Sequence, residues 1–399
     1  MFSSFNILQP CRAAVIQSVG HKNNVMSEVL ATLEKQCDKF CFIPRIPPRK
    51  VAVIGAGTDV GRIASLMLKQ QKIIKILSLY DDLPSNNVLG VASDIAHIDT
   101  SPEVVAYQGR MFLKTALHDS DVVLICGGCY VQPPGCYIND RDLFFCNMSY
   151  VRTVSLACAE FCPQAVIAVQ TPPVDCNYAL CAHTLKLAGV YDKRKVLGVN
   201  AINAMRANQL FCSITGSDPS KSNIPVVCGT GHCTRVPVFS AAKAGNIPQS
   251  QVECLTRLVR DADDIICKVK SNWEQGHLSL GFASARFVVN LMLGLFERPT
   301  FIDSALVEQG DPKKCYNMEV CATPVTVGSH GVAEYAIPSL NPFESALLED
   351  SKCDLEDMVN LGRCSAIGDD YYIHPDKLCS KIICEPCPVC APQIKKKAQ

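Results

Sequence analysis

The sequence has no excess of charge of either sign, because 38 lysine and arginine residues are balanced by 38 aspartate and glutamate residues. Without a net positive field, the chain has no overall attraction for nucleic acid or for an anionic membrane. It also has no uninterrupted apolar run of about 20 residues, the length of a membrane-spanning helix. A 399-residue chain that is 48% hydrophobic can bury a large core, so we expect a soluble, two-lobed globular protein.

No segment has the character of a secretory signal. Because disulfide scaffolds are usual in secreted chains, we do not expect one here. Cysteine is nevertheless abundant: the chain has 24, of which 15 lie between Cys126 and Cys321. Cysteines scattered singly through apolar segments behave as small buried hydrophobes. We therefore expect reduced thiols in the body of the protein.

The N-terminal segment contains no acidic residue before Glu28, but it has Arg12, Lys22 and several serines. This composition is typical of a mitochondrial transit peptide, and a disordered arm fits it equally well. Residues 1–49 are therefore predicted to be an N-terminal extension. The expected location is mitochondrial, with the cytoplasm as the alternative.

Strand-like and helix-like segments alternate from Lys50 to about residue 200. This alternation implies a parallel sheet covered on both faces, a doubly wound α/β domain of the Rossmann type over residues 50–200. Residues 201–352 show longer helices, predicted at 249–272 and 278–296, with strand-like segments between and after them. We expect this part to form a mixed α/β substrate lobe, followed by a tail at 353–399 that contains cysteine and proline.

The start of the Rossmann-type domain has the order of features that dinucleotide binding requires: strand, glycine turn, helix, second strand and terminal acid. The turn contains Gly55, Ala56 and Gly61, and Asp81 lies 20 residues after Gly61. A carboxylate at that point can accept hydrogen bonds from an adenosine ribose and repels a 2′-phosphate. The sequence therefore favours NAD over NADP.

Two residues of the turn act against phosphate binding. Thr58 brings a Cβ where the backbone should approach the phosphate closely, and Asp59 places negative charge at the helix N-terminus. Alternatively, Thr58 or Asp59 caps the helix and occupies its N–H donors. The sequence leaves two possibilities open, a turn that binds NAD, even if weakly, and a self-capped turn that binds none.

Between about Val51 and Leu348 the chain resembles malate dehydrogenases of the mitochondrial type. The segments that carry the resemblance are VAVIGAG, SLYDD, GVASDIAHI, DVVLICGG, DLFFCN, GVNAINAMRAN, IPVVCGTG, LSLGFASARF and CATPVTVG. The resemblance implies a homodimer and NAD-dependent hydride exchange between malate and oxaloacetate. In this chemistry arginines bind the substrate carboxylates, and a histidine held by an aspartate moves the proton. Asn147 matches a cofactor-contacting asparagine of the family.

The proton-transfer residues of the family are replaced. Its aspartate falls on Asn203 and its histidine on Thr230. An asparagine cannot stabilise an imidazolium by charge, and the analogous exchange in serine proteases costs roughly 10⁴-fold in rate. His232 lies two residues beyond Thr230 and is either a substitute base or an ordinary loop histidine.

The substrate arginines are only partly retained. The third arginine of the family falls on Arg206, which is intact, whereas the first falls on Val131 or Gln132. The second falls on Asp140, with Arg141 one residue later, so Arg141 substitutes only if a lengthened lid shifts its register.

These losses favour a malate dehydrogenase-like protein whose own catalysis is weak or lost, kept as a folded subunit that binds NAD or protein partners. The alternative is an active enzyme that uses His232 and Arg141 on a small dicarboxylate. A third possibility is a structural component cross-linked through the tail thiols Cys379, Cys384, Cys387 and Cys390. Their spacing matches no zinc module, so we predict no metal and favour intermolecular disulfides or unreacted thiols.

Overall fold

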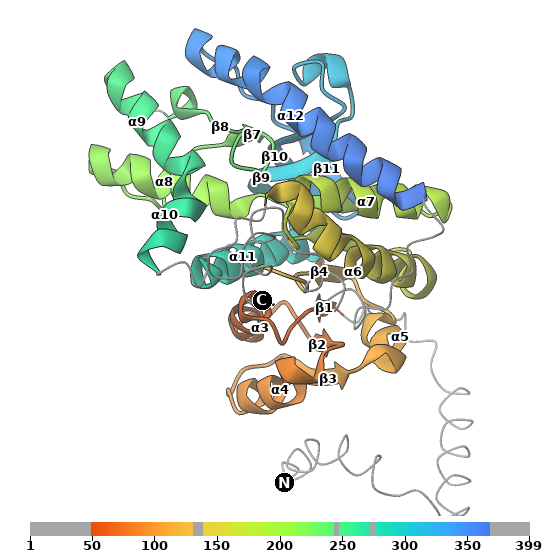
Figure 1. Ribbon diagram of the computed structural model, residues 1–399. Helices are drawn as coiled ribbons and strands as arrows, with labels where there is room; N and C mark the ends of the chain where they lie inside the picture. Colours follow the sequence, from red (N-terminus) through yellow and green to blue (C-terminus); the bar gives the residue numbers. More distant parts are fainter. Residues whose placement is uncertain (1–48, 131–138, 243–246, 271–275, 368–399) are drawn as a thin grey trace, which may run out of the picture. The chain divides into compact units, whose positions relative to one another are not determined.

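The computed structural model describes residues 49–130, 139–242, 247–270 and 276–367 (Figure 1). The predicted extension up to residue 48, the lid residues Val131 and Gln132, and the tail cysteines from Cys379 onward lie outside the described residues.

The first part of the described chain alternates strands and helices, as the sequence predicts. Its elements are β1 (Lys50–Ile54), α3 (Asp59–Lys69), β2 (Ile76–Asp81), α4 (Val88–Ala96), β3 (Glu103–Gln108), α5 (Leu113–Leu117), β4 (Val122–Ile125), α6 (Asp140–Phe161), β5 (Val166–Val169), α7 (Val174–Leu187) and β6 (Val196–Val199). These strands pair in parallel in the order β3-β2-β1-β4-β5-β6. The Rossmann-type doubly wound sheet is therefore confirmed.

Both faces of this sheet are covered. Along β1, Ala52 and Ile54 belong to one buried cluster, whereas Val51 and Val53 belong to another. Successive side chains of a strand point to opposite faces, so this alternation places one hydrophobic core on each side of the sheet. The uninterrupted apolar character of β1 follows from this two-sided burial.

The second part adds antiparallel strands and longer helices to the same sheet. Its elements are α8 (Ala201–Thr215), β7 (Val226–Cys228), β8 (Arg235–Pro237), α9 (Gln249–Arg260), α10 (Ala262–Val269), α11 (His277–Phe296), β9 (Thr300–Glu308), β10 (Val320–Gly328), β11 (Gly331–Tyr335) and α12 (Pro342–Ile367). Strand β9 pairs antiparallel with β6, and β10, β7 and β8 follow. The mixed second lobe is thus continuous with the parallel sheet.

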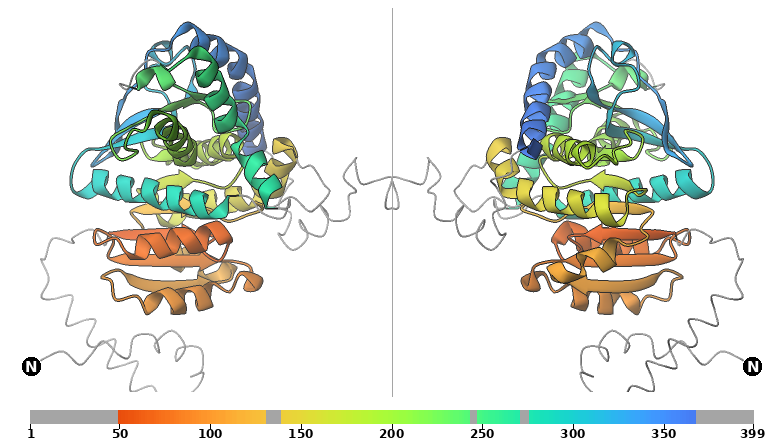
Figure 2. Two further views of the ribbon diagram at one scale, coloured as in Figure 1. Left: turned by 90° about the vertical axis from the view of Figure 1, so that its left-hand side faces the viewer. Right: turned by 90° about the vertical axis from the view of Figure 1, so that its right-hand side faces the viewer.

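Two predicted boundaries in the second lobe are wrong. The single helix predicted at 249–272 is divided at Asp261 into α9 and α10. The fold also does not end before Cys353, because α12 continues to Ile367 and buries Leu355 and Val359. Helix α12, blue in Figure 2, lies over the lobe remote from β2 and β3 and packs against α7.

Helix α11 is the one described helix that is long and apolar enough to cross a membrane. It packs against α3, α8 and β9, and its residues Phe287, Val288 and Leu291 are buried. These contacts give α11 the character of a core helix of a globular fold.

Candidate functional site

The turn after β1 brings the backbone against the end of β4. Gly55 has a φ of +95°, and a Cβ at this position would lie 2.2 Å from the backbone of Gly127. A Cβ on Gly61 would lie 2.1 Å from the carbonyl oxygen of Gly55. Only glycine tolerates this geometry, so Gly55, Ala56 and Gly61 form the tight strand-to-helix turn that the sequence predicts.

The N-terminus of α3 is capped by Thr58 and not by Asp59. The Thr58 hydroxyl accepts a hydrogen bond from Gly61 N–H at 3.1 Å and donates one to Gly55 O at 2.8 Å. One of the donors that could face a phosphate is therefore already occupied. The Asp59 carboxylate instead lies 3.4 Å from His277 Nδ1.

Asp81, at the end of β2, is 2% exposed. Its carboxylate accepts hydrogen bonds from Gly57 N–H at 3.1 Å, Leu83 N–H at 3.1 Å and Asn86 Nδ2 at 2.9 Å. Burial raises the pKa of Asp81, and these hydrogen bonds counteract part of the rise. The acid stands where a ribose-binding carboxylate is expected, but protein donors use much of its accepting capacity.

Asn147 holds the chain that follows β4. Its Oδ1 accepts from Cys129 N–H at 2.7 Å, while its Nδ2 donates to Cys129 O at 3.0 Å and to Pro172 O at 2.6 Å. The side chain is buried, and both amide hydrogens have protein acceptors. The local role of Asn147 is thus to fix this loop beside the nucleotide turn.

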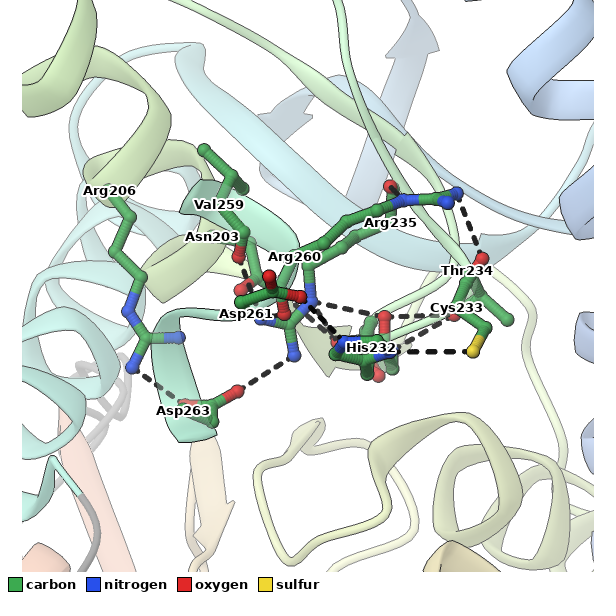
Figure 3. Close-up of polar contacts among 12 residues, drawn as sticks. Asn203, Arg206, His232, Cys233, Thr234, Arg235, Val259, Arg260, Asp261 and Asp263 are labelled. Carbon is green, nitrogen blue, oxygen red and sulfur yellow. Dashed lines mark hydrogen bonds and ion pairs between the residues drawn. The ribbon is translucent and has the colours of Figure 1, made fainter. Parts of the chain in front are cut away.

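Arg206 of α8, which the resemblance predicts to be a substrate arginine, holds a carboxylate of its own chain. Arg206 Nη2 lies 2.7 Å from Asp263 Oδ1, and Arg235 Nη2 lies 2.8 Å from Asp263 Oδ2 (Figure 3). The arginine side chains are 11% and 5% exposed, whereas that of Asp263 is 42% exposed. Asp263, in the first turn of α10, thus bridges two largely buried guanidinium groups.

The protonation state of Asp263 follows from this arrangement. Burial alone would raise the pKa of Asp263, but the Arg235 and Arg206 guanidinium groups outweigh it and hold the pKa well below its usual range. Asp263 is therefore a carboxylate throughout the physiological range. It presents to Arg206 the same group that a carboxylic acid substrate would present.

The loop between β7 and β8 is fixed by a buried acid, Asp175 of α7. Asp175 accepts hydrogen bonds from Thr230 N–H and from its hydroxyl, at 2.9 and 2.7 Å, from Gly231 N–H at 3.2 Å and from the Thr234 hydroxyl at 3.1 Å. Asn203 Nδ2 donates to Thr230 O at 3.1 Å. The structure therefore brings Asn203 and Thr230 together, but the contact is through a main-chain carbonyl and contains no titratable group.

His232 does not replace the missing pair at Asn203. Its Nε2 lies 2.8 Å from Asp261 Oδ1, and its Nδ1 lies 3.4 Å from Cys233 Sγ. The side chain is 51% exposed. In Figure 3 it lies on the side of Asp263 opposite to Arg206.

Arg141 is paired with an acid of the C-terminal helix. Its Nη2 lies 3.8 Å from Asp357 Oδ2 of α12, and both side chains are more than half exposed. Asp140, one residue earlier, is near Asp175, Arg235 and Asp263, and burial followed by the Asp175 charge raises its pKa. The described residues thus place an acid close to the arginines where the family has an arginine.

Sequence reasoning missed four residues of this site: Asp175, Arg235, Asp261 and Asp263. The signal for two of them was the run from Arg260 to Asp264, in which three acids follow the arginine. Acids cluster in the first turn of a helix, so this run could have indicated that a second helix begins there.

The structure combines a doubly wound sheet, a glycine turn, an acid at the end of the second strand and a largely buried arginine on the first helix of the next lobe. This combination is that of a dinucleotide-dependent dehydrogenase fold. Residues 49–198 match the family model "lactate/malate dehydrogenase, NAD binding domain", and residues 202–364 match "lactate/malate dehydrogenase, alpha/beta C-terminal domain". The chain belongs to the lactate/malate dehydrogenase family, and its N-terminal half is the NAD-binding domain of that family.

Relatives and solved structures agree with this assignment. The chain is 31% identical to the mitochondrial malate dehydrogenase of Homo sapiens over 315 residues, which cover 78% of this chain and 90% of the relative. It is also 31% identical to mitochondrial malate dehydrogenase 2 of Arabidopsis thaliana, with 79% and 91% covered.

Two solved structures share the fold. The apo malate dehydrogenase of Picrophilus torridus has a TM-score of 0.68 at 18% identity, with 79% of this chain and 98% of that one covered. The lactate dehydrogenase of Eimeria maxima with NADH and oxamate has the same score and identity, with 84% and 100% covered.

Proposed function

We propose that this protein is a malate dehydrogenase-like subunit that retains the NAD-binding fold but whose own turnover of dicarboxylates is weak or lost. The ion pair between Arg206 and Asp263 carries the proposal. Asp263 already holds Nη2 of the one arginine that the resemblance retains from the family's set, so a substrate carboxylate would compete with an internal carboxylate there. Nε and Nη1 of Arg206 have no hydrogen-bond partner among the described residues.

The proton-transfer side of the site supports the same conclusion. General acid–base catalysis typically contributes about 10²–10⁴-fold, and it requires a titratable group within hydrogen-bond reach of the reacting oxygen. At the family positions, Asn203 and Thr230 supply an amide and a hydroxyl. The nearby imidazole of His232 is bound to Asp261 instead.

The nucleotide side is better preserved. The turn of Gly55, Ala56 and Gly61 allows a close backbone approach. Asp81 and Asn147, which the resemblance matches to the family's cofactor contacts, lie beside this turn and beside the loop after β4. These residues would hold NAD, whose nicotinamide supplies a hydride acceptor when bound. The cap at Thr58 and the saturated side chain of Asn147 argue for weak binding.

The test separates binding from turnover. NADH oxidation with oxaloacetate is followed by absorbance, and NADH binding is measured independently by the fluorescence of the bound nucleotide. We expect binding with turnover at least about 10²-fold below that of ordinary malate dehydrogenases, because one acid–base contribution is missing. Turnover in the ordinary range would disprove the proposal, and absence of NADH binding would restrict it to a purely structural role.

The rival function is an active malate dehydrogenase, and one observation favours it. The His232–Asp261 pair has the composition of the aspartate–histidine pair of the family, although each member comes from another position. If this pair transfers the proton, His232→Gln should abolish activity, whereas Asn203→Ala should leave most of it. In the proposed function neither substitution changes the low turnover by more than a few-fold.

A homodimer is also proposed. Large apolar side chains remain exposed on three neighbouring helices, namely Leu66 on α3, Leu89 on α4, and Leu278 and Phe282 on α11. A shared apolar face of this kind needs no covalent link. Light scattering in strong reductant should give the mass of a dimer, and a monomer there would contradict the proposal.

We propose a mitochondrial location for the protein. Curated relatives from animals and a plant are named mitochondrial malate dehydrogenases, and the first residues of the chain have the composition of a transit peptide. A fluorescent fusion of the full chain should enter mitochondria, whereas deletion of residues 1–48 should leave it in the cytoplasm. A full-chain fusion outside mitochondria would refute the location, and a truncated fusion inside them would refute a targeting role for residues 1–48.

A further inference from the structure

Cys233, His232 and Asp261 form a group of nucleophile, base and acid outside the Arg206–Asp263 pair. The Cys233 thiol is exposed, and its Sγ lies 3.4 Å from His232 Nδ1. The other ring nitrogen, Nε2, lies 2.8 Å from Asp261 Oδ1. Figure 3 shows the sulfur and the carboxylate on two sides of the imidazole.

The order of these contacts fixes the roles of the two nitrogens. A carboxylate only accepts hydrogen bonds, so the nitrogen that faces Asp261 must carry the proton. In the neutral ring, Nδ1 is then left as an acceptor directed at the Cys233 thiol. This is the arrangement in which a base activates a nucleophile and a third group orients the base.

The thiol is held on a fixed segment. Cys233 O accepts hydrogen bonds from Arg260 Nη2 at 2.9 Å and from Ser351 Oγ at 3.0 Å. The next residue, Thr234, is buried and bonded to Asp175. The main chain at Cys233 is therefore anchored on both sides while its side chain remains accessible.

Charged side chains of both signs surround the group. Arg260 interacts electrostatically with Cys233, and the Arg235 guanidinium lies against the carbonyl of Gly231. The opposing acids are Asp261, which is bound to the imidazole, and Asp140, which interacts with His232. Cationic and imidazole neighbours at an exposed position are the conditions under which protein thiols react.

We propose that Cys233 is a reactive thiol that forms a mixed disulfide with small-molecule disulfides, with His232 as its base and Asp261 as the residue that positions the imidazole. The Cys233 S–H bond breaks and its proton passes to His232 Nδ1. The thiolate attacks one sulfur of the disulfide, a new S–S bond forms, and the old one breaks. The leaving thiolate takes the proton from His232, so that one thiol is consumed and another released.

The experiment compares two cysteines in the same molecule. The reduced full-length protein is treated briefly with glutathione disulfide at pH 7, quenched with acid, and mapped by peptide mass spectrometry. Cys254, exposed on α9 and without an imidazole contact among the described residues, is the internal control. Cys233 should be modified about tenfold faster than Cys254, since the imidazole that contacts its sulfur can take up the thiol proton during the attack.

Two variants identify the base and its partner. His232→Gln should lower the rate at Cys233 to that of Cys254, and Asp261→Asn should lower it partially, with the rate at Cys254 unchanged in both. The ratio of the modification rates at Cys233 and Cys254 should also fall above about pH 9, where ordinary thiols ionise without a neighbouring base. Equal rates at the two cysteines in the wild-type protein, or an unchanged ratio in His232→Gln, would overturn the proposal.

Discussion

Replacing Asp263 by asparagine should convert Arg206 from an internally paired residue into a carboxylate-binding one. The substitution keeps the size of the side chain and removes its charge. Arg206 and Arg235 would then face a neutral amide in place of the carboxylate that they now hold at 2.7 and 2.8 Å. Any incoming carboxylate would no longer compete with a tethered one.

The size of the effect follows from the contact that is lost. Two unit charges about 4 Å apart interact by about 4 kcal/mol at an effective dielectric constant of 20, but hydrogen bonds to charged groups contribute only about 1.5–3 kcal/mol net. Because Asp263 is 42% exposed, solvent screening favours the lower end of this range. About 1.5 kcal/mol corresponds to roughly tenfold in affinity.

The assay is calorimetric titration with malonate, a stable dicarboxylate, in the presence of saturating NADH. Asp263→Asn should bind it roughly tenfold more tightly than the wild-type protein. The matched control is Asp264→Asn, which removes the neighbouring exposed acid of the same helix turn and should change nothing. Equal affinity in Asp263→Asn and the wild type, or an equal gain in Asp264→Asn, would refute internal competition at Arg206.

Three further predictions concern the pH response, the C-terminal helix and the nucleotide turn. The pKa of Asp263 is lower in the fold than in the unfolded chain, so its stabilising effect is present above about pH 4 and is lost as the pH falls further. In denaturant unfolding, the difference in unfolding free energy between the wild type and Asp263→Asn should be constant from about pH 8 to about pH 5 and should vanish in acid. Truncation after Asp350 should lower the melting temperature by more than about 10 °C or prevent folding, because it removes the buried Leu355 and a single buried leucine contributes about 2–5 kcal/mol. Truncation after Ile367 should leave the melting temperature unchanged and should remove disulfide-linked species on non-reducing gels. The double substitution Thr58→Gly with Asp59→Gly should strengthen NADH binding in a fluorescence titration, at a cost of only a few tenths of a kcal/mol in unfolding free energy for the exchanged cap, because glycine is also a favourable N-cap residue.

The fold could be predicted because its signals are local and repeated. The apolar strand from Lys50, the glycine turn after it and the acid at Asp81 each indicate the same parallel domain, and the structure places them in that order. The break at Asp261 and the continuation of α12 to Ile367 were missed for opposite reasons. Amphipathic spacing on both sides of Asp261 favours one helix, and only the acids after Arg260 indicate a second helix start. The cysteines beyond residue 352 favour a tail, although Leu355 and Val359 have helical spacing.

The site could be predicted only as a set of positions. Counting along the chain predicts that Arg206 is the retained arginine and that Asn203 and Thr230 are replacements, because these residues lie in segments that resemble the family. The partner of Arg206, however, comes from a helix more than 50 residues later in the chain, and no local pattern connects the two.

This long-range pairing changes what a retained residue means. In sequence, an intact Arg206 argues for a surviving substrate clamp, since its guanidinium is suited to a carboxylate. In the structure Asp263 takes up part of this capacity through Nη2 of Arg206, so the same charge attraction that would bind a substrate stabilises the junction between α8 and α10. Once an internal acid has taken this place, selection for the fold alone suffices to keep the arginine, because removing one partner of such a pair leaves the other charge uncompensated. Arg206→Ala should therefore destabilise the protein even though it removes little catalysis. The double variant Arg206→Leu with Asp263→Leu should recover only part of the lost stability, because it leaves the buried guanidinium of Arg235 without its carboxylate.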